Sequence, residues 1–318
     1  MAKVNSKATQ CGLNFSVSLL HPRYWMSWII LIFMFILAQL PVSIRHALGR
    51  RIGDYNYRNN KKRHDIVETN LKIAFPELST DAREKMIREN LQWYACAMID
   101  YSLLFFAHKR RMASMLQIDG KEHIEKAIEA NQSIILLLAH SAMLEFAPAA
   151  LGYHFEIFGS YKTSKNALLD WMIAKGRCRF AKFVVSREEG LRKLVKALRP
   201  ERLMIFLPDE DLGIDNAIFV PFFGKNKATL TTTARIAKMG KALALPIFCW
   251  YDPNIKKYRT QVLAALKNYP SGDAETDAKT LNLALEELIK QHPEQYMWQM
   301  KWYRTRPDNE SSLYAVNQ

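Results

Sequence analysis

The fold is decided by the stretch Ser133–Pro148, which reads SIILLLAHSAMLEFAP. The run IILLL is apolar without alternation, as in a strand that is buried on both faces of a parallel sheet. His140 follows that run almost at once, and a helical pattern surrounds Glu145 five residues later. Open α/β sheets place their active sites at the carboxyl ends of strands, so this turn is the first candidate for a site.

Short apolar runs alternate with helical patterns from about residue 114 onward. The apolar runs are Ile134–Leu138, Phe155–Gly159, Leu203–Leu207, Ala217–Pro221, Leu243–Trp250 and Gln261–Ala265. The helical patterns lie at about 121–130, 142–151, 166–177, 187–199, 230–240 and 274–291. This alternation predicts an α/β fold with a mostly parallel sheet flanked by helices. We expect one domain over 64–318, with a helical lead-in over 64–112 and an α/β core over 113–318. Within the lead-in, one helix is expected over about Ala82–Ala107.

The charge of the chain is concentrated at its N-terminus. The 318 residues include 45 Lys+Arg and 31 Asp+Glu, a net charge of +14, which favours an acidic partner such as nucleic acid, anionic lipid or an acidic protein. Residues 1–63 hold ten of the basic residues and one acid, Asp54, and so contribute +9. This segment also contains the uncharged run Tyr24–Ile44, in which Trp25 and Trp28 lie near one end.

The apolar run Tyr24–Ile44 has three interpretations. It could be a buried core helix, a cleaved signal peptide or a membrane anchor. Twenty-one helical residues extend about 32 Å, close to one hydrocarbon core, and we favour the anchor, which either spans the bilayer or lies partly in one leaflet. The basic residues that follow it place the rest of the chain on the cytoplasmic side, according to the positive-inside rule.

Several kinds of site lack their usual marks. The sequence contains no GxSxG, Walker A or GxGxxG motif and no HExxH pair. The four cysteines, Cys11, Cys96, Cys178 and Cys249, form no CxxC pair, which predicts reduced thiols and no metal site. We expect no cofactor.

His140 and Glu145 can act together only in a particular geometry. On a continuous helix, residues five apart differ by about 500°, so their side chains point about 140° apart. They meet only if His140 lies in the turn before the helix. A carboxylate on one imidazole nitrogen would then leave the other as a base. The alternative is that His140 caps a helix and Glu145 makes a surface ion pair.

The HxxxxE pattern resembles the HxxxxD/E motif of glycerolipid acyltransferases. The whole chain resembles one branch, the lipid A late (secondary) acyltransferases, which are the lauroyl/myristoyl acyltransferases of lipopolysaccharide biosynthesis. The matching blocks are Asn70–Glu77, His140–Glu145, Tyr161–Asn166, Leu169–Trp171, Arg177, Leu207–Asp211, Val220–Gly224, Ala228–Thr229, Pro293–Trp298 and Arg304.

The resemblance implies acyl transfer from an acyl carrier protein thioester to the 3-hydroxyl of an acyl chain on a lipid A precursor. Overall likeness favours the myristoyl-type second step. His140 would be the general base, oriented by Glu145. Arg177, Asn166 and Asp209 would bind substrate or the oxyanion, although Asn166 could instead cap a helix and Asp209 could begin a turn.

The resemblance also implies a location and partners. The enzyme would sit at the bacterial inner membrane through a single N-terminal anchor, with its catalytic domain on the cytoplasmic face. Acyl carrier protein, the glycolipid and the membrane would be its partners, and no nucleic acid is expected. The alternative is an acyltransferase with the same dyad that acts on a glycerophospholipid precursor or another glycolipid. The sequence leaves open the acyl chain length, the number of chains transferred and the oligomeric state.

Overall fold

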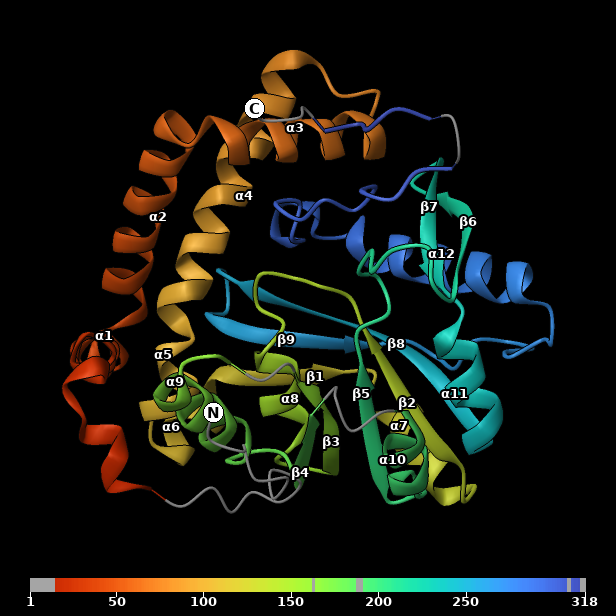
Figure 1. Ribbon diagram of the computed structural model, residues 1–318, viewed down its shortest axis with the longest axis horizontal. Helices are drawn as coiled ribbons and strands as arrows, with labels where there is room; N and C mark the ends of the chain where they lie inside the picture. Colours follow the sequence, from red (N-terminus) through yellow and green to blue (C-terminus); the bar gives the residue numbers. More distant parts are fainter. Residues whose placement is uncertain (1–14, 162–163, 187–190, 308–309, 315–318) are drawn as a thin grey trace.

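The computed structural model describes residues 15–161, 164–186, 191–307 and 310–314 (Figure 1). Its first part is helical: η1 (Val17–Leu20), η2 (Pro22–Tyr24), α1 (Trp25–Gln39), α2 (Val42–Asn59), α3 (Lys61–Ala74), α4 (Thr80–Asp100), α5 (Ser102–Phe106) and α6 (Lys109–Met115). The rest contains the strands β1 (Leu116–Asp119), β2 (Ser133–Leu138), β3 (Glu156–Tyr161), β4 (Phe183–Ser186), β5 (Arg202–Phe206), β6 (Ala217–Phe222), β7 (Lys225–Leu230), β8 (Ala242–Asp252) and β9 (Lys257–Val262). Its helices are α7 (Lys121–Glu129), α8 (Phe146–Leu151), α9 (Ala167–Arg177), α10 (Leu191–Ala197), α11 (Thr232–Gly240), α12 (Ala274–Ile289) and η4 (Pro293–Gln295).

Seven strands form the main sheet in the order β1-β9-β8-β2-β5-β3-β4. The strands β8, β2, β5, β3 and β4 are parallel to one another, whereas β9 is antiparallel to β8 and β1 is parallel to β9. Strand β2 is interior, and its side chains are buried on both faces. Ile135 and Leu137 pack into one hydrophobic cluster, and Ile134, Leu136 and Leu138 pack into the other. The predicted α/β class with a mostly parallel sheet is confirmed.

The apolar run Ala217–Pro221 does not join this sheet. It lies in β6, which pairs only with β7 among the described strands, in a separate antiparallel hairpin. Two consecutive positive φ angles, 49° at Phe223 and 73° at Gly224, close the hairpin with the left-handed backbone that two-residue turns require. Pro221 lacks an N–H donor, which also disfavours a central position in a sheet.

Two helices that the apolar pattern predicts as continuous are interrupted. The run Tyr24–Ile44 is divided at Pro41, which cannot donate the backbone hydrogen bond that would continue α1. The expected helix over about Ala82–Ala107 is divided at Tyr101 into α4 and α5.

Helix α2 packs along the length of α4 (Figure 1). Gly49 and Gly53 allow this close approach, since a Cβ at Gly49 would lie 2.6 Å from the Cys96 Sγ and one at Gly53 would lie 2.4 Å from the Gln92 Cα. Helix α3 also contacts α4, so α2 and α3 pack against the same partner.

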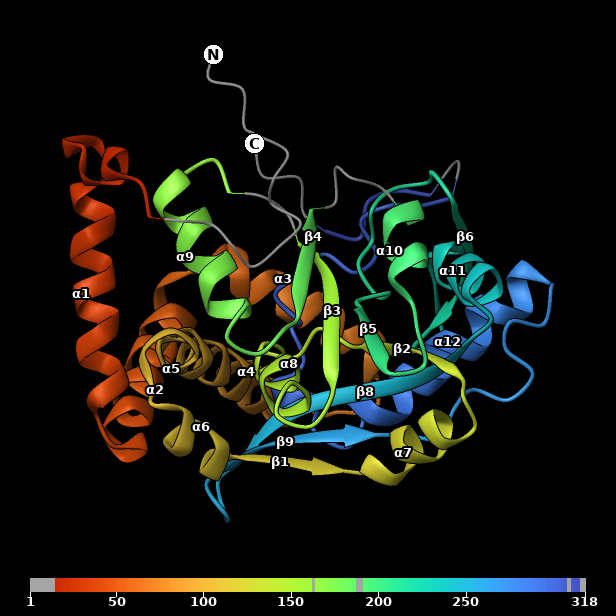
Figure 2. The ribbon, with the colours of Figure 1, turned by 90° about the horizontal axis from the view of Figure 1, so that it is seen from below.

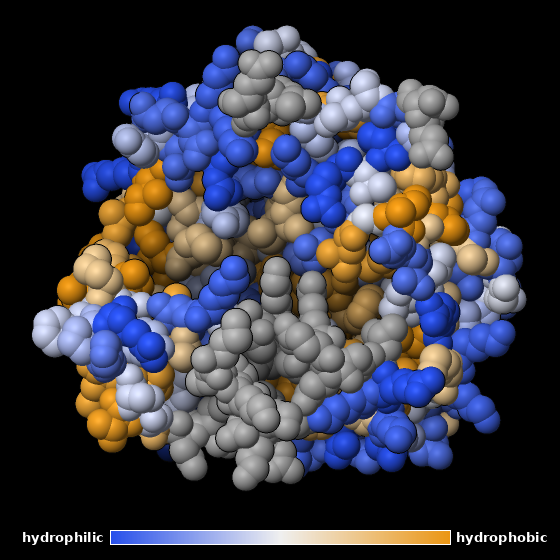
Figure 3. Space-filling view, in the orientation of Figure 1, coloured by the Kyte–Doolittle hydropathy of each residue, from blue (hydrophilic) through white to orange (hydrophobic). Residues whose placement is uncertain are grey.

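Helix α1 stands at one edge of the molecule, away from the sheet (Figure 2). Within the described residues, the segment Pro22–Gln39 is apolar and long enough to cross a membrane, and 28% of it is buried. Large apolar side chains are exposed along it, and apolar residues gather at this edge of the surface (Figure 3). These side chains are Trp25, Met26, Ile29, Ile30, Ile32, Phe33, Phe35 and Ile36.

The cysteines differ in state. Cys96 and Cys249 are buried free thiols, but Cys178 is disulfide-bonded, so the prediction of reduced thiols is wrong for Cys178. Cys11 lies outside the described residues.

Candidate active site

The turn after β2 carries His140 without starting a helix. Strand β2 ends at Leu138, and α8 begins only at Phe146, so the helix expected over 142–151 is shorter than its pattern. The backbone of this turn is held by a distant segment. His140 O accepts a hydrogen bond from Met297 N at 2.9 Å, and Ala142 N donates to Gln295 O at 2.7 Å. The C-terminal segment around η4 therefore fixes the backbone on which the imidazole stands.

Two helices of the lead-in support that segment. The Asn90 side chain on α4 donates to the carbonyls of Glu294 and Tyr296 at 3.0 and 2.7 Å. Asn70 on α3 donates likewise to the carbonyls of Trp298 and Met300. Both asparagines are buried, so the two amides satisfy backbone groups that water cannot reach.

Asp209 is the partner of the imidazole. It follows β5, the neighbour of β2 in the sheet, and its Oδ1 lies 2.5 Å from His140 Nδ1. Its Oδ2 accepts the backbone N–H of His140 at 2.8 Å and the hydroxyl of Tyr296 at 2.9 Å. The Asp209 side chain is fully buried, and that of His140 is 11% exposed. Because Nδ1 donates to a carboxylate, Nε2 is left as the proton acceptor.

The pair perturbs the pKa of both its members. Burial lowers the pKa of His140, but the charge and hydrogen bond of Asp209 outweigh burial, so the pKa is raised above its usual value. Burial raises the pKa of Asp209, whereas the attraction of His140 lowers it, and the pKa falls below its usual value. Asp209 is therefore ionised and able to stabilise an imidazolium.

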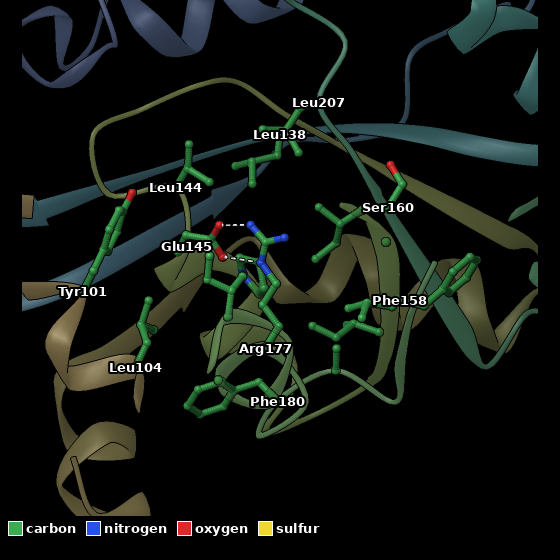
Figure 4. A pocket seen from close by; sticks show the side chains of 18 of the residues that line it. Tyr101, Leu104, Leu138, Leu144, Glu145, Phe158, Ser160, Arg177, Phe180 and Leu207 are labelled. Carbon is green, nitrogen blue, oxygen red and sulfur yellow. Dashed lines mark hydrogen bonds and ion pairs between the residues drawn. The ribbon is translucent and has the colours of Figure 1, made fainter. Parts of the chain in front are cut away.

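Glu145 does not hold the imidazole, which corrects the arrangement expected from the sequence. Its carboxylate forms a bidentate ion pair with Arg177 on α9, in which Arg177 Nε lies 3.3 Å from Oε2 and Nη2 is bonded to Oε1. Figure 4 shows the two side chains pointing toward each other. The turn over residues 141–145 presents Glu145 toward α9, whereas Asp209 reaches His140 from the adjacent strand.

His140, Glu145 and Arg177 line one cavity of about 460 Å³. Most of its other walls are apolar and come from α5, α9 and the strands β2–β5 (Figure 4). The apolar lining includes Leu104, Leu138, Leu144, Ile157, Phe158, Ile173, Phe180, Val184, Ile205 and Leu207. A volume within the usual range of about 300–1,000 Å³, apolar walls and a few polar groups are typical of a site for a small or extended apolar ligand.

The other predicted site residues have structural contacts. Asn166 is the N-cap of α9, where its Oδ1 accepts from Leu168 N and Leu169 N at 3.0 and 3.2 Å, and its Nδ2 lies 2.9 Å from Ser27 Oγ on α1. Both oxygens of Asp209 are occupied by His140 and Tyr296, so Asp209 acts through the imidazole and not on a ligand directly.

Sequence reasoning missed the partners that surround the dyad. Tyr296 stands out in the sequence only as part of a matched block, and its hydroxyl donates to Asp209. The Trp302 ring stacks on Tyr296 at 4.8 Å and lies 5.8 Å from the His140 ring. No spacing rule joins residues this far apart in the chain, and the available signal was only the apolar and aromatic composition of 293–303.

The site holds an imidazole that is bonded to a buried carboxylate, beside an apolar cavity at the carboxyl end of a parallel strand. This arrangement is typical of a site for transfer or hydrolysis of an apolar group. Comparison with known proteins makes the class specific. The family model described as bacterial lipid A biosynthesis acyltransferase matches residues 13–305. The chain belongs to this family and is an acyltransferase.

Individual relatives cover nearly the whole chain. The lipid A biosynthesis lauroyltransferase of Escherichia coli is 33% identical over 95% of this chain and 98% of its own length. The palmitoleoyltransferase of the same organism is 31% identical over 96% of this chain and 99% of its own length. Its myristoyltransferase is 28% identical over 95% of this chain and 94% of its own length.

Proposed function

We propose that this protein transfers a fatty acyl chain from an acyl carrier protein thioester to the 3-hydroxyl of an acyl chain on a lipid A precursor. The His140–Asp209 pair carries the proposal, because a hydroxyl is a poor nucleophile near neutral pH and needs a base to take its proton as it attacks. The pair lies at the wall of an apolar cavity, where an acyl chain and a base can meet.

The residues would act in two proton transfers. His140 Nε2 removes the proton from the acceptor hydroxyl while its oxygen bonds to the thioester carbonyl carbon. The tetrahedral intermediate then breaks the carbon–sulfur bond, and the imidazolium returns the proton to the departing thiolate of the carrier. Asp209 stabilises the imidazolium between these steps. No acyl group is held on the enzyme at any stage.

Glu145 and Arg177 have a different role in this proposal. A guanidinium held by a carboxylate is fixed in position and orientation. Arg177 lines the cavity with His140, so it is our candidate donor to the thioester oxyanion or to a substrate anion. Glu145 sets the position of that guanidinium.

The exposed apolar surface of α1 supports attachment to a membrane. A 15-residue helix extends about 22 Å, less than a hydrocarbon core, so α1 alone would enter one leaflet unless the preceding turns extend it. We propose the inner membrane as the location, with the cavity on the cytoplasmic side, and residues 1–63 as the anchoring segment of an enzyme whose catalytic residues lie in 64–318.

A transfer assay with defined donors and acceptors assigns the acylation step. The identity is higher to the lauroyl- than to the myristoyltransferase, so it does not favour the myristoyl-type step that the overall likeness suggested. The experiment is to incubate the purified full-length protein with acyl carrier protein bearing labelled C12, C14 or C16 chains. The acceptors are tetraacylated and pentaacylated lipid A precursors and a lysophosphatidate. Labelling of a lipid A precursor supports the proposal, and labelling of lysophosphatidate alone contradicts it.

A further inference from the structure

A buried lysine faces the dyad without a hydrogen-bond partner. Lys227 lies on β7 of the small hairpin, and its side chain is fully buried. Its Nζ makes no hydrogen bond in the described part of the chain. Two aromatic rings enclose it instead. The Phe222 ring centre lies 4.9 Å from Nζ and the Trp302 ring centre 5.8 Å from it.

These rings connect the ammonium to the dyad. Trp302 stacks on Tyr296, whose hydroxyl donates to Asp209, and Trp302 also lies beside the imidazole. An ammonium buried among rings without a paired carboxylate is costly, because little but the ring faces replaces its hydration. This unfavourable charge lies next to His140, the proposed general base.

The charges around this site act in opposite directions on the imidazole. Asp209 and Glu210 raise the pKa of His140, and Lys227 lowers it. Asp209 and Asp211 in turn act on the ammonium: burial lowers the pKa of Lys227 to about 8, and the two carboxylates oppose that shift. Across the cavity, Glu145 and Arg177 offset each other as an ion pair. Tyr296 contributes a neutral hydroxyl.

We propose that Lys227 is a positioning residue of the His140–Asp209 pair, whose buried positive charge opposes protonation of the imidazole before the reaction and so favours its proton-accepting form. The inference rests on the proposed function in that His140 is taken as the base. An aspartate alone would favour the imidazolium, which cannot accept a proton. The ammonium favours the ionised Asp209 and the neutral imidazole together.

The strand itself offers a matched control. Lys225 lies two residues before Lys227 on β7, but its side chain is 43% exposed. Solvent screens its charge, so Lys225→Met removes the same group without the same field. Lys227→Met and Lys227→Gln remove the buried charge in two ways, and Lys227→Arg keeps it. Cooperative thermal unfolding selects the variants that are folded.

The first measurement does not depend on turnover. Diethyl pyrocarbonate reacts with neutral imidazole, and mass spectrometry of the His140 peptide over a pH series gives the pH at which half of the imidazole is neutral. We expect this midpoint to move to higher pH in Lys227→Met and Lys227→Gln and to stay at the wild-type value in Lys225→Met and Lys227→Arg. A midpoint in Lys227→Met and Lys227→Gln that equals the wild-type value, or lies below it, would overturn the proposal.

The second measurement is the pH profile of kcat/KM with the acyl donor and acceptor of the proposed function. In Lys227→Met and Lys227→Gln, the acidic limb should move with the His140 midpoint. Relative to wild type, kcat/KM should be several-fold lower at low pH, and this difference should disappear on the alkaline plateau, where Lys227 is itself neutral. A shifted midpoint with an unshifted acidic limb would support the role of Lys227 on the imidazole and contradict His140 as the base.

Discussion

Asp209 holds both the imidazole and the backbone N–H of His140, a residue 69 positions earlier in the chain. Two hydrogen bonds that one buried carboxylate accepts fix the ring as well as the turn that carries it. Since β5 and β2 are adjacent parallel strands, their carboxyl ends meet at the same edge of the sheet. The His140–Asp209 contact therefore depends on β2 and β5 being neighbours in the sheet.

Replacing His140 by Ala should lower kcat by about 10²–10⁴-fold, the usual contribution of a general base. The fold should be retained, because the side chain packs at the wall of a cavity and its backbone contacts remain. The measurement is transfer of a labelled acyl chain, with circular dichroism as the control. Near wild-type transfer by this variant would remove His140 from the mechanism.

Replacing Asp209 by Asn should lower kcat and also move the acidic limb of kcat/KM to lower pH. The sign follows from the carboxylate: Asp209 raises the pKa of His140, so its removal lets that pKa fall. The direction is opposite to that expected for Lys227→Met. A pH series of initial rates checks both, and an acidic limb at the wild-type position would argue against the Asp209–His140 contact in the active enzyme.

Glu145→Gln should weaken transfer without moving the acidic limb. Glu145 pairs with Arg177 and not with His140, so its loss removes the ion pair that holds the guanidinium but leaves the imidazole oriented. Arg177→Met should give a similar loss, and the double variant should be no worse than the single ones because the two residues act as a unit. Additive losses in the double variant would mean that the two residues act separately.

The size of the cavity should set the preferred donor chain. Val184 on β4 lines the cavity. Val184→Phe should lower transfer of the longest accepted chain more than that of shorter ones, and Val184→Ala should act in the opposite direction. Competition between acyl carrier protein donors of different length, in one reaction, gives the ratio directly. Equal loss for all chain lengths would place Val184 outside the acyl path.

A buried ion pair joins α2 to α4 and the sheet. Arg45 Nε and His46 Nε2 bind the two oxygens of Asp100 at 2.6 and 2.7 Å, and Tyr258 donates to Asp100 as well. Arg45→Met should cost about 3–5 kcal/mol of unfolding free energy, because it leaves a buried carboxylate without the guanidinium that pairs with it. Denaturant unfolding measures this loss. Adding Asp100→Asn should restore part of it, and no recovery would show that packing of the Arg45 stem dominates.

The sequence alone identified the elements whose signal is local. The run IILLL predicted the interior strand because a strand covered on both faces has no polar positions. The same reasoning located His140 at the end of that strand, and the α/β class followed from the alternation of runs and helical patterns. Local patterns failed at Ala217–Pro221, where an equally apolar run pairs in a hairpin outside the sheet.

Only the tertiary structure decided which groups act on the imidazole. Spacing joined His140 to Glu145 because they are five residues apart, but the turn at 141–145 directs Glu145 to Arg177. Asp209, Tyr296 and Lys227 reach the dyad from β5, the C-terminal segment and the hairpin. Their distances from His140 depend on how distant strands are ordered and packed, and a sequence carries no local pattern for that. The position of His140 at the end of a strand was a local property, whereas its partners and its charge environment were set by the packing of the whole domain.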